Sequence, residues 1–215
     1  MKTPLLRILS GIVLLLVATF VIWQGLSRPT RLVLMHIADD VQTAGAAPAN
    51  LLLGSSTLAR LDTATLSNCG NWLNRAVGNS LLTDIKHYLS WTPIQHQPQH
   101  ILLYAGENDV AQSKTAPQVA AEYMALLKQI MAHYPAAQIH ILAIKRSPAR
   151  QQYWPAFDEV NAKLQAYATL QPQLHYYANN LLQTDFSADG IHLTGEGYRR
   201  FFHGVTLTCK AATNG

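Results

Sequence analysis

The sequence predicts a three-layer α/β/α domain with a mainly parallel sheet of about five strands, preceded by an N-terminal transmembrane or signal helix. From residue 51 onward, short apolar runs alternate with longer segments of helical periodicity. This alternation is typical of parallel strands joined by crossover helices. Residues 101–105 are apolar throughout, as expected of a strand covered on both faces.

The apolar runs define the expected strands, and the segments between them define the expected helices. We expect strands at residues 51–53, 72–77, 101–105, 139–144 and 174–177. We expect helices at residues 81–89, 117–133, 155–170 and 196–204. Within residues 117–133 the apolar side chains follow helical spacing, and Pro117 lies near the start, where proline is tolerated. Within residues 155–170 one apolar stripe carries Phe157, Val160, Leu164 and Tyr167.

The first 27 residues predict a membrane segment. Lys2 and Arg7 precede an uncharged stretch at residues 8–27, and twenty helical residues rise about 30 Å, the thickness of a bilayer core. A cleaved signal peptide is the alternative, but the bulky end of the stretch lacks an A-x-A site. We therefore expect an anchor through residues 5–27, with the domain in the periplasm or extracytoplasmic space, or secreted if the segment is cleaved.

The bulk composition predicts one domain behind that segment. A chain of 215 residues with 49% hydrophobic and 13% charged residues is long enough for one buried core and an appendage. We expect a segment at residues 1–27, a connector at 28–50 and the domain at 51–215. The net charge of +4 is not gathered into a basic run, so no nucleic-acid partner is expected.

Cysteine and histidine spacing predicts neither a metal nor a cofactor, because the sequence contains no H-E-x-x-H or C-x-x-C motif. Cys69 and Cys209 could pair in an oxidising compartment or remain two unrelated thiols. Tyr153 and Trp154 could line a substrate cleft or belong to a packed loop.

Three residues predict a hydrolytic triad. Asp189 lies three positions before His192, so a turn can place the carboxylate against one ring nitrogen and leave the other free. Ser55 and Ser56 follow an apolar run and Gly54, where a strand would end in a tight turn. We expect Ser56 to be the nucleophile, His192 the base and Asp189 the residue that orients the base.

An ester hydrolase also needs donors for the oxyanion that forms when the nucleophile attacks. The backbone N–H of Ser56 is one candidate, and a backbone N–H of the Gly78–Asn79 turn is another. The side-chain amide of Asn108 is a third. All three positions follow expected strands, and ligands gather at the carboxyl ends of parallel strands.

These motifs together resemble the four blocks of the SGNH, or GDSL, hydrolases. The G-D-S block reads Gly54-Ser55-Ser56, with serine in place of the aspartate, and the glycine block resembles residues 74–80 loosely. The G-x-N-D block is matched by residues 106–109, and the D-x-x-H block by residues 189–192. The resemblance covers about residues 51–205 and implies a flavodoxin-like sheet.

The resemblance implies a serine ester hydrolase that acts through an acyl-enzyme. Its substrate would be a small-molecule acyl ester or an acyl ester of lipid or polysaccharide in the cell envelope. Two alternatives remain open at this point. One is an O-acyltransferase that uses the same triad, and the other is a non-catalytic envelope binding module that retains the fold.

Overall fold

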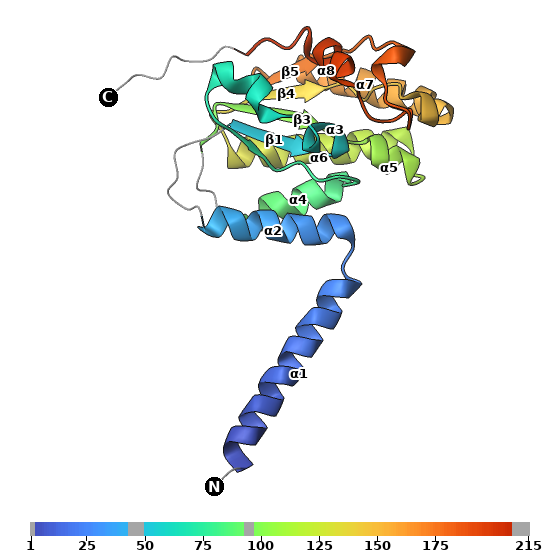
Figure 1. Cartoon of the computed structure of the whole chain (residues 1–215). Coiled ribbons are helices and arrows are strands. Elements are labelled where there is room, and N and C mark those ends of the chain that lie inside the picture. Colours follow the sequence, from blue (N-terminus) through green and yellow to red (C-terminus); the bar gives the residue numbers. More distant parts are fainter. Residues whose placement is uncertain (1–2, 43–49, 93–96, 208–215) are drawn as a thin grey trace.

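Five parallel strands form one sheet in the order β2-β1-β3-β4-β5. The computed structural model describes residues 3–42, 50–92 and 97–207. The strands are β1 (Asn50–Gly54), β2 (Trp72–Asn74), β3 (His100–Tyr104), β4 (Gln138–Leu142) and β5 (Leu174–Tyr177). The predicted three-layer α/β architecture with a five-stranded parallel sheet is confirmed (Figure 1).

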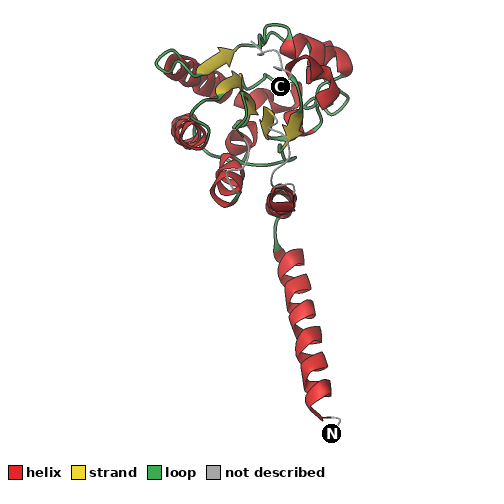
Figure 2. Ribbon diagram, turned by 90° about the vertical axis from the view of Figure 1, so that its left-hand side faces the viewer, coloured by secondary structure: helices red, strands yellow, loops and turns green. Residues whose placement is uncertain are grey.

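Helices cover both faces of the sheet (Figure 2). On one face, α4 (Leu82–Trp91), α6 (Ala116–His133) and α7 (Trp154–Ala168) pack against Leu51 and Leu53. On the other face, α3 (Ser56–Ala59) and α8 (Gly195–Phe202) pack against Leu52. Successive side chains along a β-strand point to opposite faces of the sheet, so the side chains of β1 pack alternately into two separate apolar cores. The shorter elements are η1 (Thr63–Cys69), α5 (Glu107–Ala111), η2 (Pro148–Tyr153) and η3 (Gln183–Asp185).

The strand order places a topological switch point between β1 and β3. From β1 the chain moves outward to β2 and then returns to the other side of β1 at β3. A crevice at the carboxyl ends of the strands is expected at such a point, because the connections leave in opposite directions. Strand β2 is shorter than the predicted strand at residues 72–77. After Asn74, whose side chain accepts a hydrogen bond from the Ala76 N–H at 3.1 Å, the N–H groups of Arg75 and Val77 still donate to the Leu52 and Gly54 carbonyls of β1, at 2.9 and 2.8 Å.

Helix α1 (Thr3–Gly25) runs away from the domain, as Figures 1 and 2 show. Its described apolar side chains are exposed; Leu14, for example, is 70% exposed. Among the described residues, no single helix has the length and apolarity needed to cross a membrane. Helices at Gly11–Gly25 and Pro29–Gln42, bent by 120°, pass that test only as a pair. Anchoring through residues 5–27 stays a prediction, which partition of the full chain into the membrane fraction would test.

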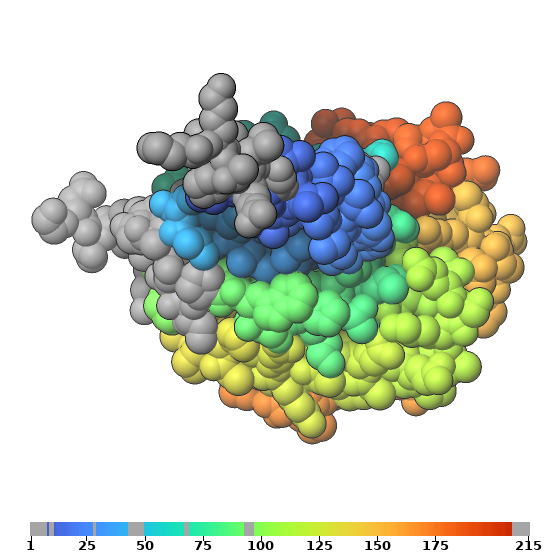
Figure 3. Space-filling model, turned by 90° about the horizontal axis from the view of Figure 1, so that it is seen from below, coloured from blue at the N-terminus to red at the C-terminus, as the bar shows by residue number. Residues whose placement is uncertain are grey.

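Helix α2 (Arg28–Gln42) lies where a connector was expected, and it packs beside α4 (Figure 3). Asp40 of this helix is 1% exposed and binds three side chains from other segments. The carboxylate accepts hydrogen bonds from Arg75 Nε at 2.9 Å, Tyr88 Oη at 2.6 Å and Thr92 Oγ1 at 2.8 Å. These bonds attach α2 to the segment after β2 and to the end of α4.

The rest of the expected connector, residues 43–49, lies outside the described residues. The same holds for Cys209, whereas Cys69 is disulfide-bonded.

Replacement of Asp40 by alanine should destabilise the chain by about 3–5 kcal/mol, because it leaves the buried Arg75 guanidinium without its main partner. The neighbouring Asp39 also binds Arg75, but its side chain is 52% exposed. Asp39→Ala is therefore the matched control and should cost about 1 kcal/mol or less. Denaturant unfolding measures both values, and equal losses in the two variants would contradict the role assigned to Asp40.

Candidate active site

The nucleophile candidate Ser56 is positioned by a close approach of two strands. At the end of β1, Gly54 has a φ of +144°, and a Cβ atom there would overlap the carbonyl oxygen of Tyr104 on β3. Only glycine fits this position without moving a strand. The next N–H, of Ser55, donates to that same Tyr104 oxygen at 2.9 Å. Helix α3 then starts at Ser56, so the Ser56 side chain lies at the carboxyl edge of the sheet.

The structure brings the three predicted triad residues together. Ser56 Oγ lies 3.0 Å from His192 Nε2, although the two residues are 136 positions apart. His192 Nδ1 lies 2.5 Å from Asp189 Oδ2. The order serine, imidazole, carboxylate is the one required for a general base that takes the serine proton and is held by the carboxylate.

The Asp189 carboxylate is fixed by the turn that contains it. Its Oδ1 accepts hydrogen bonds from the backbone N–H groups of Ile191 and His192, both at 2.9 Å, and from Ser187 Oγ at 3.0 Å. The hydrogen bond with the His192 side chain, followed by these backbone donors, holds the pKa of Asp189 well below its usual range. The carboxylate therefore remains ionised and can stabilise a positive charge on the imidazole.

The predicted oxyanion turn is tied to the end of β1. Val77 N–H donates to the Gly54 carbonyl at 2.8 Å, and Ser80 Oγ donates to the same oxygen at 3.0 Å. Between them, Asn79 has a φ of +64°. This left-handed conformation is one that asparagine tolerates better than most residues, which explains how it can replace a glycine here.

Three backbone N–H groups near the candidate nucleophile have no acceptor in the described part of the chain. Within residues 50–92 and 97–207, no acceptor binds the N–H groups of Ser56, Gly78 or Asn79. The first group opens α3, and the other two lie on the loop that Gly54 holds in place. This arrangement can supply donors to a developing negative charge.

Hydrogen bonds at both the nitrogen and the oxygen of its side-chain amide orient Asn108, which lies on α5. Its Nδ2 donates to the Ser80 carbonyl at 2.9 Å, which occupies one of its two hydrogens. Its Oδ1 accepts from Arg150 Nη1 and Nη2, both at 3.1 Å. No acceptor among the described residues binds its second amide hydrogen. The adjacent Asp109 has a structural contact instead, because it accepts the Leu82 N–H that opens α4, at 3.1 Å.

Arg150 belongs to a buried ionic network that sequence patterns did not indicate. Glu107, one residue before Asn108, accepts from Lys145 Nζ at 2.6 Å and from Ser147 Oγ at 2.8 Å, and lies 3.3 Å from Arg150. Burial alone would raise the pKa of Glu107, but Lys145 and Arg150 outweigh it, so the pKa is lowered. The available signal was Lys145, a charge directly after the mostly apolar strand expected at residues 139–144.

No metal site emerges from the described part of the chain. No three His, Cys, Asp or Glu side chains there are arranged to hold a metal ion.

The sequence pattern of the GDSL-like Lipase/Acylhydrolase family matches residues 43–200. The chain belongs to this family. Membership supports acyl-ester chemistry in general, by hydrolysis or by acyl transfer. No curated protein sequence matches the chain at a significant level.

Solved structures of other proteins share the fold at low sequence identity. A GDSL-like lipase from Bacteroides thetaiotaomicron aligns with a TM-score of 0.63 and 15% identity over 77% of this chain and 91% of that one. A family 3 carbohydrate esterase from Clostridium thermocellum aligns with a TM-score of 0.59 and 15% identity, over 73% of this chain and 92% of the esterase. The C-terminal catalytic domain of peptidoglycan O-acetyltransferase A from Streptococcus pneumoniae aligns with a TM-score of 0.50 and 13% identity, over 74% of this chain and 87% of that domain. At this level of sequence identity, the similarity shows a shared fold.

The Asp189 carboxyl should show no titration between about pH 7 and pH 4 in carbon NMR spectra of the folded chain. A depressed pKa means that the stabilising effect of Asp189 is present above its unfolded pKa of about 3.9 and is lost as the pH falls through the folded value. The side chain is 45% exposed, so the effect on stability is small and the resonance is the better measurement. A midpoint at or above about 3.9 would contradict this electrostatic description.

Proposed function

We propose that this chain is a serine acyl-ester hydrolase whose acyl-enzyme forms on Ser56. The observation that carries the proposal is the hydrogen-bonded series from Ser56 through His192 to Asp189, in which Oγ and Nε2 lie 3.0 Å apart. Family membership supports the same reaction class. The substrate is an acyl ester of an alcohol, with lipid or carbohydrate esters of the cell envelope as the candidates.

In the first half-reaction, His192 Nε2 accepts the proton of Ser56 Oγ while that oxygen attacks the ester carbonyl. Asp189 stays ionised and stabilises the imidazolium through Nδ1. The imidazolium then donates its proton to the alcohol oxygen as the bond between carbonyl carbon and alcohol breaks. The alcohol leaves, and the acyl group remains on Ser56.

In the second half-reaction, a water molecule replaces the alcohol. His192 takes a water proton, the oxygen attacks the acyl carbon, and the proton is returned to Ser56 Oγ as the acid leaves. If a sugar hydroxyl replaces water, the same intermediate leads to acyl transfer. Comparison of water with an added alcohol as acceptor separates these two outcomes.

The oxyanion that forms in both halves is bound by the N–H groups of Ser56, Gly78 and Asn79 and by Asn108 Nδ2. Donors fixed before the reaction are effective because they need no reorganisation when the charge develops. Arg150 acts as a positioning residue for Asn108. Its two bonds to Asn108 Oδ1 fix which end of the amide faces the reacting carbonyl and withdraw electron density from its N–H groups.

Ser56→Ala should abolish p-nitrophenyl acetate hydrolysis by the full-length chain, lowering kcat by about 10⁴ or more, because the nucleophile is gone. Treatment with a fluorophosphonate, followed by peptide mass spectrometry, should locate the adduct on Ser56. Ser55→Ala is the matched control and should keep turnover, since the structure uses that residue through its backbone. Absence of both hydrolysis and labelling in the wild-type chain would favour the non-catalytic binding module.

Arg150→Ala should lower kcat for p-nitrophenyl acetate by about 10- to 100-fold and change KM little, because loss of one oxyanion donor costs about 3–4 kcal/mol and misplacement costs less. Arg150→Lys should restore part of the rate, since lysine keeps the charge but not the fork of donors. Arg199→Ala removes an exposed arginine paired with Glu196 and serves as control. An unchanged kcat in Arg150→Ala would exclude the positioning role.

A further inference from the structure

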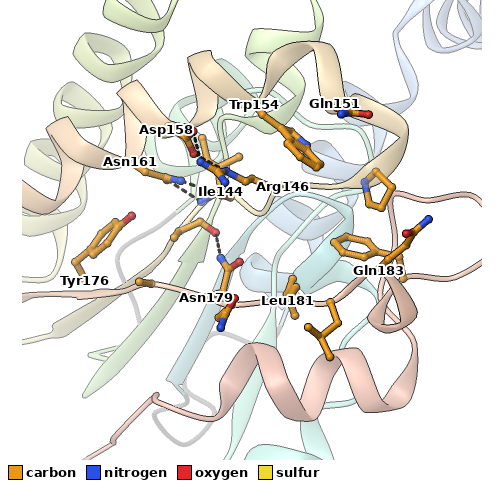
Figure 4. A pocket seen from close by; sticks show the side chains of 16 residues that line it. Ile144, Arg146, Gln151, Trp154, Asp158, Asn161, Tyr176, Asn179, Leu181 and Gln183 are labelled. Atoms are coloured by element: carbon orange, nitrogen blue, oxygen red, sulfur yellow. Dashed lines mark hydrogen bonds and ion pairs between the residues drawn. The ribbon is translucent and has the colours of Figure 1, made fainter.

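A cavity of about 600 Å³ opens at the carboxyl ends of β4 and β5 (Figure 4). One side is formed by α7, which contributes Trp154, Asp158 and Asn161. The opposite side is formed by the segment after β5, which contributes Asn179 and Leu181. A cavity of this size is in the range of ligand sites in proteins.

This cavity is separate from the triad but lies along the same edge of the sheet. None of the residues that line it belongs to the triad or the oxyanion donors. Its wall includes Pro148 and Phe186, and the triad side begins immediately beyond, where Ala149 N–H donates to the Gly190 carbonyl at 3.1 Å. From β1 there are two strand spacings to β4, or about 10 Å, and three to β5, or about 14 Å. A short acyl group on Ser56 does not reach that far, so the cavity is suited to the alcohol part of an ester.

The walls of the cavity are held rigidly by the fold. Asn161 makes two hydrogen bonds with the backbone of Ile144, both at 2.9 Å. Trp154 Nε1 donates to the Ser147 carbonyl at 3.0 Å, and Asn179 Nδ2 donates to the Ala143 carbonyl at 2.9 Å. A cavity whose walls are already fixed binds a ligand without the cost of ordering them.

The charges in the cavity cancel. Arg146 and Asp158 form a two-point ion pair, with Nε to Oδ1 at 2.9 Å and Nη2 to Oδ2 at 2.5 Å. The remaining polar side chains are mostly amides, and Gln151, Asn180 and Gln183 are exposed at the rim. An amide both donates and accepts hydrogen bonds, as a hydroxyl group does.

Two half-buried aromatic side chains complete the lining. Trp154 and Tyr176 pack partly against the larger apolar core and contribute ring surface to the cavity. Burial, with a further contribution from Asp158, raises the pKa of Tyr176 to about 12, so its hydroxyl stays protonated near neutral pH. Aromatic rings with a polar tip suit ligands that carry both apolar and hydroxylated surfaces.

We propose that this cavity binds a neutral sugar residue of an oligosaccharide whose acyl ester is presented to Ser56. The assignment of the ester rests on the proposed function, whereas the binding of the sugar does not. A lipid chain would take the exposed amides of Gln151, Asn180 and Gln183 out of water without offering them a hydrogen-bond partner, which is costly. An anion would find no net positive charge, because Asp158 neutralises Arg146. Hydroxyl groups match the amides and aromatic rings.

The test uses full-length Ser56→Ala chain kept in lauryldimethylamine oxide, a detergent without a sugar head group. Cellotetraose and xylotetraose are titrated by calorimetry, and tetragalacturonate is the anionic counterpart. The variant Gln151→Ala/Gln183→Ala removes two rim amides. The control Gln152→Ala/Gln165→Ala removes two exposed glutamines outside the lining. The indole N–H resonance of Trp154, identified with Trp154→Phe, reports binding at the cavity itself.

At least one neutral tetrasaccharide should bind and shift the Trp154 resonance. The rim variant should weaken binding about tenfold, or about 1.4 kcal/mol, which is the size expected for two lost hydrogen bonds. The control should bind as Ser56→Ala does. The control double substitution, made in the wild-type background, should leave p-nitrophenyl acetate turnover within about twofold, because neither glutamine lines the cavity or belongs to the triad.

Three results would overturn the proposal. These are no shift of Trp154 at about 10 mM of either neutral sugar, equal weakening in rim variant and control, or tighter binding of tetragalacturonate than of the neutral sugars. Failure of the wild-type chain to hydrolyse p-nitrophenyl acetate, with sugar binding at the cavity intact, would contradict the proposed hydrolase and leave the cavity assignment standing.

Discussion

The contact between the ends of β1 and β3 at Gly54 governs the geometry of the whole candidate site. The two strands approach so closely there that residue 54 has no room for a side chain. The Gly54 carbonyl then accepts the Val77 N–H at 2.8 Å and Ser80 Oγ at 3.0 Å. One glycine therefore fixes the positions of the candidate nucleophile Ser56, which opens α3, and of the loop that carries Gly78 and Asn79, both relative to β3.

A second constraint comes from the buried charge of Glu107. An ionised carboxylate removed from water must be surrounded by donors, and here Lys145, Tyr104, Ser147 and Arg150 surround it. Because Asn108 follows Glu107 on the same short helix, the contacts that satisfy the carboxylate also fix the neighbouring amide. The contacts that offset the cost of burying the charge thereby also orient the side-chain amide that we propose as an oxyanion donor.

The sequence predicted those parts of the molecule that depend on local patterns. Apolar runs located the strands, and the three-residue spacing of Asp189 and His192 predicted their contact, which a single turn creates. Residues that act through distant partners were missed. Asp40 binds Arg75, Tyr88 and Thr92, and no sequence pattern in residues 28–50 predicts those contacts. Arg150 likewise meets Asn108 only once β3 and β4 lie side by side.

The serine at residue 55, where the family motif has aspartate, bears directly on whether the site is catalytic. The structure uses Ser55 through its backbone, because its N–H donates to Tyr104 and its carbonyl accepts the N–H groups of Leu58 at 3.1 Å and Ala59 at 3.0 Å. Its side chain makes no capping bond to α3. Every backbone contact that shapes the turn is therefore independent of the side chain at this position. The loss of the aspartate leaves the Ser56 hydroxyl within 3.0 Å of His192, so this departure from the motif does not argue against turnover.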